Sequence, residues 1–231
     1  IEIATNHRRD TEHVEEVREG LPEKVELAFL PGLRGVAIRI STRSEVGRAE
    51  TLLGEAEAVL DPIVAPFRIG IGKTDLVEAV AEVLASDSLT LAVAESCTGG
   101  LIAKRITDLP GSSTYFRGGV VAYADRVKSD LLGLDEVLLT ENGAVSEAVA
   151  ADMARGVADL LDTDVGLGIT GIAGPGGGTL EKPVGTVWFA VAVAGHVCTS
   201  HRVFGGDREA VRERASQAAL LLLYETVMDS A

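Results

Sequence analysis

Four short polar segments stand out in the second part of the sequence. Three of them, residues 94–100, 110–119 and 170–178, combine hydroxyl groups with glycine, and the fourth is residues 123–128. The first stands where a strand passes into a helix, and its hydroxyls and free N–H groups would form an anion site. An ordinary helix cap with a glycine pair explains the same residues equally well. The segment at 170–178 holds more glycine than a turn needs, which favours a backbone-lined cradle for phosphate or ribose.

Two familiar phosphate-binding motifs are incomplete in this chain. Residues 72–74 resemble the end of a P-loop, but Phe67 stands where that motif requires glycine. Residues 166–171 match G-x-G-x-x-G, yet they lie inside an apolar strand, and Gly174-Pro175 follows where a dinucleotide site needs a helix. We therefore expect neither a P-loop nor a Rossmann site.

Composition excludes several classes of function. The 231 residues carry 35 acidic against 21 basic side chains, and a net charge of −14 repels nucleic-acid backbones. No apolar run approaches the ~18 residues of a membrane span. Two cysteines suit a reducing cytoplasm, where we expect the protein to reside. The four histidines lack zinc-ligand spacing, so we expect no zinc site built from them. We also expect no other metal and no organic cofactor.

The chain divides near residues 61–75, where prolines and glycines interrupt the periodic pattern. Residues 1–70 predict a small α+β domain, and residues 71–231 an α/β domain with a mixed sheet flanked by helices. The predicted helices are 9–19, 44–60 (capped at Ser44), 75–85, one from about 99, 126–132, 146–161 and 207–228. The predicted strands are 25–30, 36–41, 89–94, 120–123, 165–172, 185–194 and 196–204. Because the sequence lacks an initiator Met, we expect a segment of a longer protein.

Seven ordered motifs in the second region resemble the C-terminal family of CinA proteins. They are AESCTGG, PGSS, a Tyr with a Lys five residues on, GAVSE, TGIAGPGGG, KPVGTVW and GDREAVR, and they cover roughly residues 76–228. The resemblance implies nicotinamide mononucleotide amidohydrolase activity. It also implies that residues 1–70 are the KH-like domain that precedes this module.

An RNA-binding role for that first domain is not expected. Residues 1–75 hold 10 basic against 14 acidic side chains, a net charge of −4. The GxxG spacing of Gly32 and Gly35 lies between two predicted strands, so a hairpin turn explains it better than an RNA clamp. We expect a scaffolding or interface role instead.

The resemblance further implies a serine amidohydrolase with Ser113 as nucleophile, Lys128 as base and Tyr123 assisting proton transfer to ammonia, while backbone N–H groups stabilise the oxyanion. Lys128 falls in the first turn of a helix that Asp125 would cap, where the helix dipole disfavours an ammonium group and Asp125 opposes that effect. The alternative is a solvated surface lysine.

Cys97 is interpreted as a buried wall residue rather than a nucleophile, because no histidine is placed to act as its base.

We expect the substrate to be a small nucleotide, with Lys182 and Arg208 as phosphate partners. The expected substrate-binding residues are Ser96, Thr98, Gly99, Thr170, Gly171, Gly174, Gly176, Lys182 and Arg208. The apolar strand at 185–194 and the terminal helix offer interface surface, so a homodimer or higher homo-oligomer is expected. The alternative function is a regulatory module that binds the nucleotide without turnover.

Overall fold

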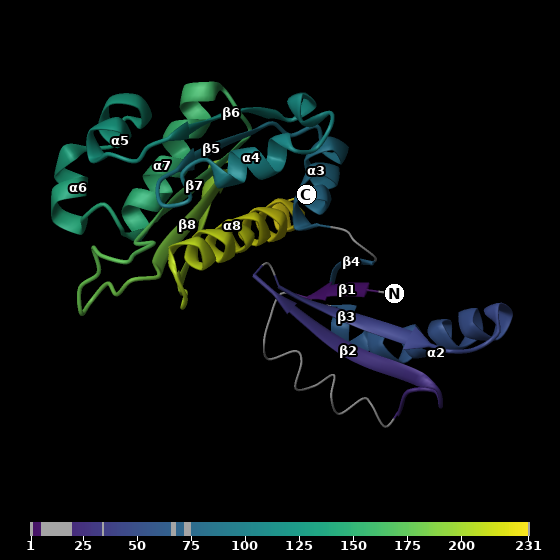
Figure 1. The fold of residues 1–231 in the computed structure, drawn as a ribbon. Helices are drawn as coiled ribbons and strands as arrows, with labels where there is room; N and C mark the ends of the chain where they lie inside the picture. The colour runs from purple at the N-terminus through teal and green to yellow at the C-terminus, as the bar shows by residue number, and fades with distance from the viewer. Residues whose placement is uncertain (1, 6–19, 34, 66–67, 72–74, 231) are drawn as a thin grey trace. The chain divides into compact units, whose positions relative to one another are not determined.

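The computed structural model describes residues 2–5, 20–33, 35–65, 68–71 and 75–230, and it divides the chain into two compact units (Figure 1). The first unit is Ile1–Ala79 and the second is Val80–Ala231. The division thus falls later in the chain than the boundary we predicted after residue 70. The helix predicted at 9–19 lies outside the described residues.

The first unit is built on a four-stranded antiparallel sheet in the order β2-β3-β1-β4. Its elements are β1 (Glu2–Thr5), β2 (Val25–Gly32), β3 (Gly35–Thr42), α2 (Val46–Val64) and β4 (Arg68–Ile71). Gly32 pairs with Gly35 in the hairpin register, which confirms the predicted turn. Helix α2 follows Glu45 as its N-cap, so the cap predicted at Ser44 is wrong. Strands β1 and β4 were not predicted.

The second unit contains a five-stranded mixed sheet in the order β6-β5-β7-β8-β9. Its strands are β5 (Leu91–Glu95), β6 (Phe116–Val121), β7 (Val165–Gly171), β8 (Thr186–Val193) and β9 (His196–Val203). Strands β5, β6 and β7 run parallel, and β8 and β9 complete the sheet as antiparallel members. This arrangement confirms the α/β class with a mixed sheet.

Helices connect these strands and cover both faces of the sheet. They are α4 (Leu101–Thr107), the 3-10 turn η3 (Ser112–Thr114), α5 (Asp125–Leu132), α6 (Glu136–Asn142), α7 (Glu147–Leu161) and α8 (Arg208–Ser230), while α3 (Leu76–Ser86) precedes β5. Helix α7 lies on one face, and α4 and α8 lie on the other (Figure 1). Among the described helices, none combines the length and apolar character that a membrane crossing requires.

Three sequence predictions need correction in this unit. Strand β6 begins at Phe116, so the last four residues of the loop predicted at 110–119 are strand. Helix α6 was missed. The apolar strand predicted as interface surface is β8, which pairs on both sides and is covered by α7 and α8. A strand covered on both faces reads as a continuous apolar run, which explains why it resembled a surface for association.

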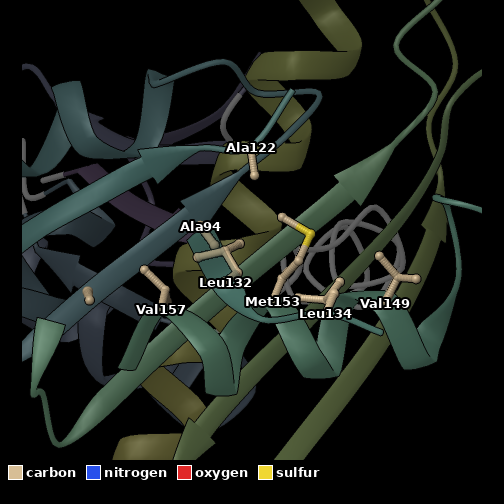
Figure 2. Packing of buried hydrophobic residues seen from close by; sticks show 8 residues of the cluster. Ala94, Ala122, Leu132, Leu134, Val149, Met153 and Val157 are labelled. Atoms are coloured by element: carbon tan, nitrogen blue, oxygen red, sulfur yellow. The ribbon is translucent and has the colours of Figure 1, made fainter. Parts of the chain in front are cut away.

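The core beneath α7 joins the helix to the sheet. Ala94 of β5 packs there with Leu132, Val149, Met153 and Val157, all of them buried (Figure 2). Alternate residues of β5 point to opposite faces, so Glu95 faces the side of α4. The packing beneath α7 therefore fixes the position of this helix on the sheet.

Glycines in β7 allow α7 to approach the sheet closely. A Cβ atom added to Gly166 would lie 2.0 Å from the carbonyl oxygen of Ala154, and one added to Gly168 would lie 2.4 Å from that of Ala150. Both contacts are with backbone, which cannot move aside. The G-x-G pattern thus serves helix-strand packing, in agreement with our rejection of a dinucleotide motif.

We predict that Gly166→Ala lowers the free energy of unfolding by about 2–3 kcal/mol, as overpacking of a close helix-strand contact does. Gly205→Ala is the matched control, because a Cβ atom there meets no atom within 4 Å. Urea unfolding of both variants measures the difference. Equal stability of the two variants would contradict the close-contact account.

A hydrogen-bonded bracket joins the starts of β5 and β7. Asp164 Oδ2 accepts hydrogen bonds from Thr90 Oγ1 at 2.6 Å and from Thr90 N at 2.8 Å. These bonds, led by that of the Thr90 side chain, lower the pKa of Asp164. A carboxylate whose pKa is lower in the folded state stabilises the fold above its unfolded pKa, and that stabilisation is lost as pH falls through the folded value.

We therefore predict that Asp164→Asn lowers Tm at pH 7 by about 2 °C, a figure already discounted for the solvent exposure of the carboxylate. The difference from wild type should shrink as pH falls from about 4, where the unfolded carboxylate takes up its proton, through the lower pKa of the folded Asp164, below which both side chains are neutral. Thermal melts at pH 7 and pH 3 measure this, with Asp159→Asn on the exposed side of α7 as control. A difference that persists unchanged at pH 3 would show that charge has no part in the bracket.

Candidate active site

The ends of the three parallel strands meet at one edge of the second unit's sheet. Ser96 directly follows β5, Tyr123 lies two residues beyond β6, and Thr170 is the penultimate residue of β7. A cavity of about 220 Å³ opens at this edge. It is lined by Ser96, Cys97, Tyr123, Asp125, Lys128, Ala144, Val145, Thr170, Gly171, Ala173 and Arg208.

Lys128 is the most deeply buried charged group of this cavity. Its side chain is 1% exposed, and Nζ donates a hydrogen bond to Asp125 Oδ1 at 2.9 Å. The alternative of a solvated surface lysine is therefore wrong. Asp125 is the first residue of α5 rather than its cap, because Ala124 is the N-cap and no side chain caps the helix. The predicted cap is thus an ion-pair partner.

Ser96 is the serine that lines this cavity among the residues that the structure describes, and it is 8% exposed. Its backbone N–H donates to the carbonyl of Ile169 at 3.0 Å, and its carbonyl accepts from Gly99 N at 3.1 Å. Main-chain bonds on both sides hold the residue in place at the end of β5. A hydroxyl and a buried amine thus share one small cavity.

Ser113 does not reach the cavity. It is exposed in η3, ahead of β6, whereas Tyr123 and Lys128 follow β6. The six residues of β6 carry the chain from one edge of the sheet to the other, roughly 20 Å at 3.3 Å per residue. Ser113 therefore does not lie beside Tyr123 and Lys128 in this chain as predicted, because an extended strand separates it from them.

Arg208 connects two parts of the cavity rim. Its Nη2 donates to the hydroxyl oxygen of Tyr123 at 2.8 Å, and its Nη1 donates to the carbonyl of Gly174 at 2.7 Å. Because the tyrosine oxygen accepts from Arg208, its own proton is left to be donated elsewhere. The first residue of α8 thereby orients the hydroxyl group that follows β6.

An apolar wall faces these polar groups. Thr170 Oγ1 donates to the carbonyl of Ala144 at 2.6 Å and so holds the segment between α6 and α7 against β7. Ala144 and Val145 of this segment line the cavity together with Ala173. Sequence analysis did not assign these residues, although GAVSE was among the motifs that it singled out. Part of the cavity lining is therefore apolar.

The sequence matches the CinA C-terminal domain family over residues 73–227, about two thirds of the chain. The chain belongs to the CinA family. It is 50% identical over 195 residues to a CinA-like protein of Gemmatimonas aurantiaca, which covers 84% of this chain and 46% of the relative. A CinA-like protein of Gloeobacter violaceus is 41% identical over 236 residues, covering 96% of this chain and 55% of the relative. The chain thus spans about half the length of these curated relatives.

Solved structures of the CinA superfamily resemble this chain. A competence-damaged protein (CinA) superfamily protein from Klebsiella pneumoniae superimposes with a TM-score of 0.65 at 36% identity, covering 67% of this chain and 96% of that one. One from Escherichia coli gives a TM-score of 0.62 at 39% identity, covering 64% and 87%. The mixed α/β fold is therefore that of the CinA superfamily.

The anion site predicted after β5 of this CinA-family chain is filled by the protein itself. The buried carboxylate of Glu95 accepts hydrogen bonds from the backbone N–H groups of Gly100, Ile102 and Ala103 at 3.0, 3.2 and 2.8 Å. This carboxylate satisfies N–H groups that would otherwise be free at the start of α4. The N-cap residue Gly100 has no side-chain cap, so the carboxylate of Glu95 takes the place of both the predicted anion and an ordinary helix cap.

The predicted substrate-binding residues divide into two groups. Ser96, Thr170, Gly171 and Arg208 line the cavity. The other five do not line it. Thr98 is fully buried, and its carbonyl accepts a hydrogen bond from Arg212, while Gly99 lies in the exposed turn before α4 and Gly176 is also exposed. The carbonyl of Gly174 accepts a hydrogen bond from Arg208, and Lys182 Nζ donates to the carbonyl of Asn142 at 2.8 Å. Lys182 therefore ties its loop to α6 instead of facing the cavity.

Cys97 lines the cavity next to Ser96 and is buried. Burial raises the pKa of its thiol to about 12. The thiolate is the nucleophilic form of cysteine, so Cys97 is protonated and unreactive at neutral pH. This agrees with its interpretation as a wall residue.

Proposed function

We propose that this CinA-family chain hydrolyses the carboxamide of nicotinamide mononucleotide to nicotinate mononucleotide and ammonia. One observation carries the proposal: Ser96 and the buried Lys128 line the same cavity, and among the described residues no histidine lines it. An amide-cleaving serine needs a base, and a neutral lysine is the known alternative to histidine. The nucleophile of the proposal is therefore Ser96, in place of the Ser113 suggested by the family resemblance.

In the first half-reaction, Ser96 Oγ attacks the carboxamide carbon while the neutral amine of Lys128 takes the Oγ proton. The carbonyl oxygen becomes an oxyanion, and its collapse breaks the C–N bond. The proton held by Lys128 passes to the departing nitrogen, which leaves as ammonia. Water then attacks the resulting ester and gives a proton to Lys128. Lys128 passes this proton to the departing Ser96 Oγ as the nucleotide acid is released, which restores the hydroxyl and the neutral amine.

The hydroxyl of Tyr123 has a free proton because its oxygen accepts from Arg208. In the proposed reaction this proton is donated to the developing oxyanion or relayed to the leaving nitrogen. A donor already oriented toward developing charge is worth about 3–4 kcal/mol in acyl transfer. Arg208 thus supports the chemistry through Tyr123.

The size and walls of the cavity favour a pyridine carboxamide. At about 220 Å³ the cavity is smaller than a typical pocket for a whole drug-sized ligand, which is roughly 300–1,000 Å³. The ring and its amide would occupy the cavity against Ala144 and Val145. The ribose phosphate would then lie outside, beside the cationic Arg208 and the glycine-rich loop.

We predict that wild-type protein releases ammonia from nicotinamide mononucleotide and that Ser96→Ala lowers kcat by at least ~1,000-fold, as loss of a serine nucleophile does. The variant should still gain Tm on addition of the nucleotide, because only an oxygen atom is removed. Ser113→Ala and Cys97→Ala are the matched controls and should retain near wild-type turnover. Loss of activity in Ser113→Ala with turnover intact in Ser96→Ala would contradict the assignment. A Tm gain in the wild type without any ammonia release would favour the regulatory module instead.

We also predict that Lys128→Arg and Lys128→Met each lower kcat/KM by at least ~100-fold, the usual effect of removing a general base. Arginine keeps the charge but stays protonated, and methionine keeps the linear shape without the amine. The wild-type rate should rise with pH as the neutral amine becomes more populated. Ammonia release measured between pH 6 and 10 tests this, and an active Arg variant with a flat wild-type profile would rule out Lys128 as the base.

A further inference from the structure

We propose that Asp125 is a positioning residue that sets the pH range of the reaction through its ion pair with Lys128. The inference rests on the proposed function, because it assumes that Lys128 must lose a proton before Ser96 attacks. One exposed carboxylate thus controls the pH at which a buried lysine becomes a base. Sequence analysis took Asp125 for a helix cap that also opposes the effect of the helix dipole on Lys128, and the ion pair gives it a direct role.

The ion pair is asymmetric in its exposure. The Lys128 side chain is 1% exposed and that of Asp125 is 63% exposed, although Nζ and Oδ1 are 2.9 Å apart. Both residues belong to α5, three positions apart, so the helix holds the carboxylate beside the amine. Among the described residues, Asp125 is the hydrogen-bond partner of Nζ, and the other two N–H donors of an ammonium would need solvent or substrate.

Asp125 is the carboxylate among the described residues that line the cavity, and the other titratable groups there are of different kinds. The titratable groups that line the cavity besides the pair are Cys97, Tyr123 and Arg208. The high pKa of Cys97, which burial raises to about 12, keeps its thiol neutral, and Arg208 is engaged by Tyr123 and Gly174. The nearby carboxylate of Glu95 is bound to the N–H groups of α4.

Helix α7 packs against α5 through apolar residues, and its Asp152 and Arg155 form an ion pair with each other. Helix α7 presents the buried side chains of Val149 and Met153 to Leu132 of α5, and Gly156 lies against the Leu132 carbonyl. The carboxylate of Asp125 is therefore the negative charge that acts most directly on Nζ. Because an anion at hydrogen-bond distance favours the ammonium form, Asp125 delays formation of the neutral base until higher pH.

The experiment compares pH profiles of kcat/KM for wild type, Asp125→Asn and Asp130→Asn. Asn keeps the shape and the acceptor oxygen of Asp125 and removes only the charge. Asp130→Asn is matched, because Asp130 forms an exposed ion pair with Arg126 on the same helix at the same 2.9 Å and does not line the cavity. We expect the rising limb of the Asp125→Asn profile to lie about 1 pH unit lower, the small end of the range for an adjacent opposite charge. The Asp130→Asn profile should coincide with that of wild type.

A second readout separates this inference from the proposed function. The titration midpoint of Lys128, followed by NMR of its labelled side chain and assigned with Lys128→Met, should fall in Asp125→Asn whether or not the protein turns over nucleotide. An unmoved midpoint and unmoved limb in Asp125→Asn would overturn the role of Asp125, even if ammonia is released. An equal movement in Asp130→Asn would also overturn it, since net charge alone would then be responsible. A moved midpoint without ammonia release would keep the control of Lys128 by Asp125 and reject the amidohydrolase.

Discussion

The parallel alignment of β5, β6 and β7 is the constraint on which the site depends. Parallel strands end at the same edge of a sheet, so the residues that follow them meet even when they are far apart in sequence. Here that edge brings together Ser96, Tyr123 with Lys128, and Thr170. The glycines at 166 and 168 matter for the same reason, because they let α7 lie close enough to hold these strands and the segment before α7 in place.

Burial of Lys128 is the second feature that needs a functional explanation. An ammonium group taken out of water costs free energy unless it is paired, and a methionine of similar shape would avoid that cost. Perturbed or buried ionisable groups in a cleft are typical of catalytic sites. The pairing with the exposed carboxylate of Asp125 offsets part of that cost.

Sequence alone predicted the class of fold and most of the second unit's elements, because those strands and helices carry strong hydrophobic patterns. It also placed Tyr123, Lys128, Thr170 and Arg208 near one site. It missed the separation of Ser113 from this group, since spacing along the chain does not reveal that a strand spans the sheet between them. It likewise could not show that Glu95 fills the start of α4, because a carboxylate inside an apolar strand gives no sign of where it points.

The proposed reaction requires that Ser96 form a covalent bond with the nicotinoyl group during turnover. Acid quench of the wild-type protein in the first turnovers with nicotinamide mononucleotide, followed by peptide mass mapping, tests it most directly. We expect an ester that adds the mass of the acylated nucleotide to the peptide containing Ser96. The same mass found on Ser113, with the Ser96 peptide unmodified, would contradict it.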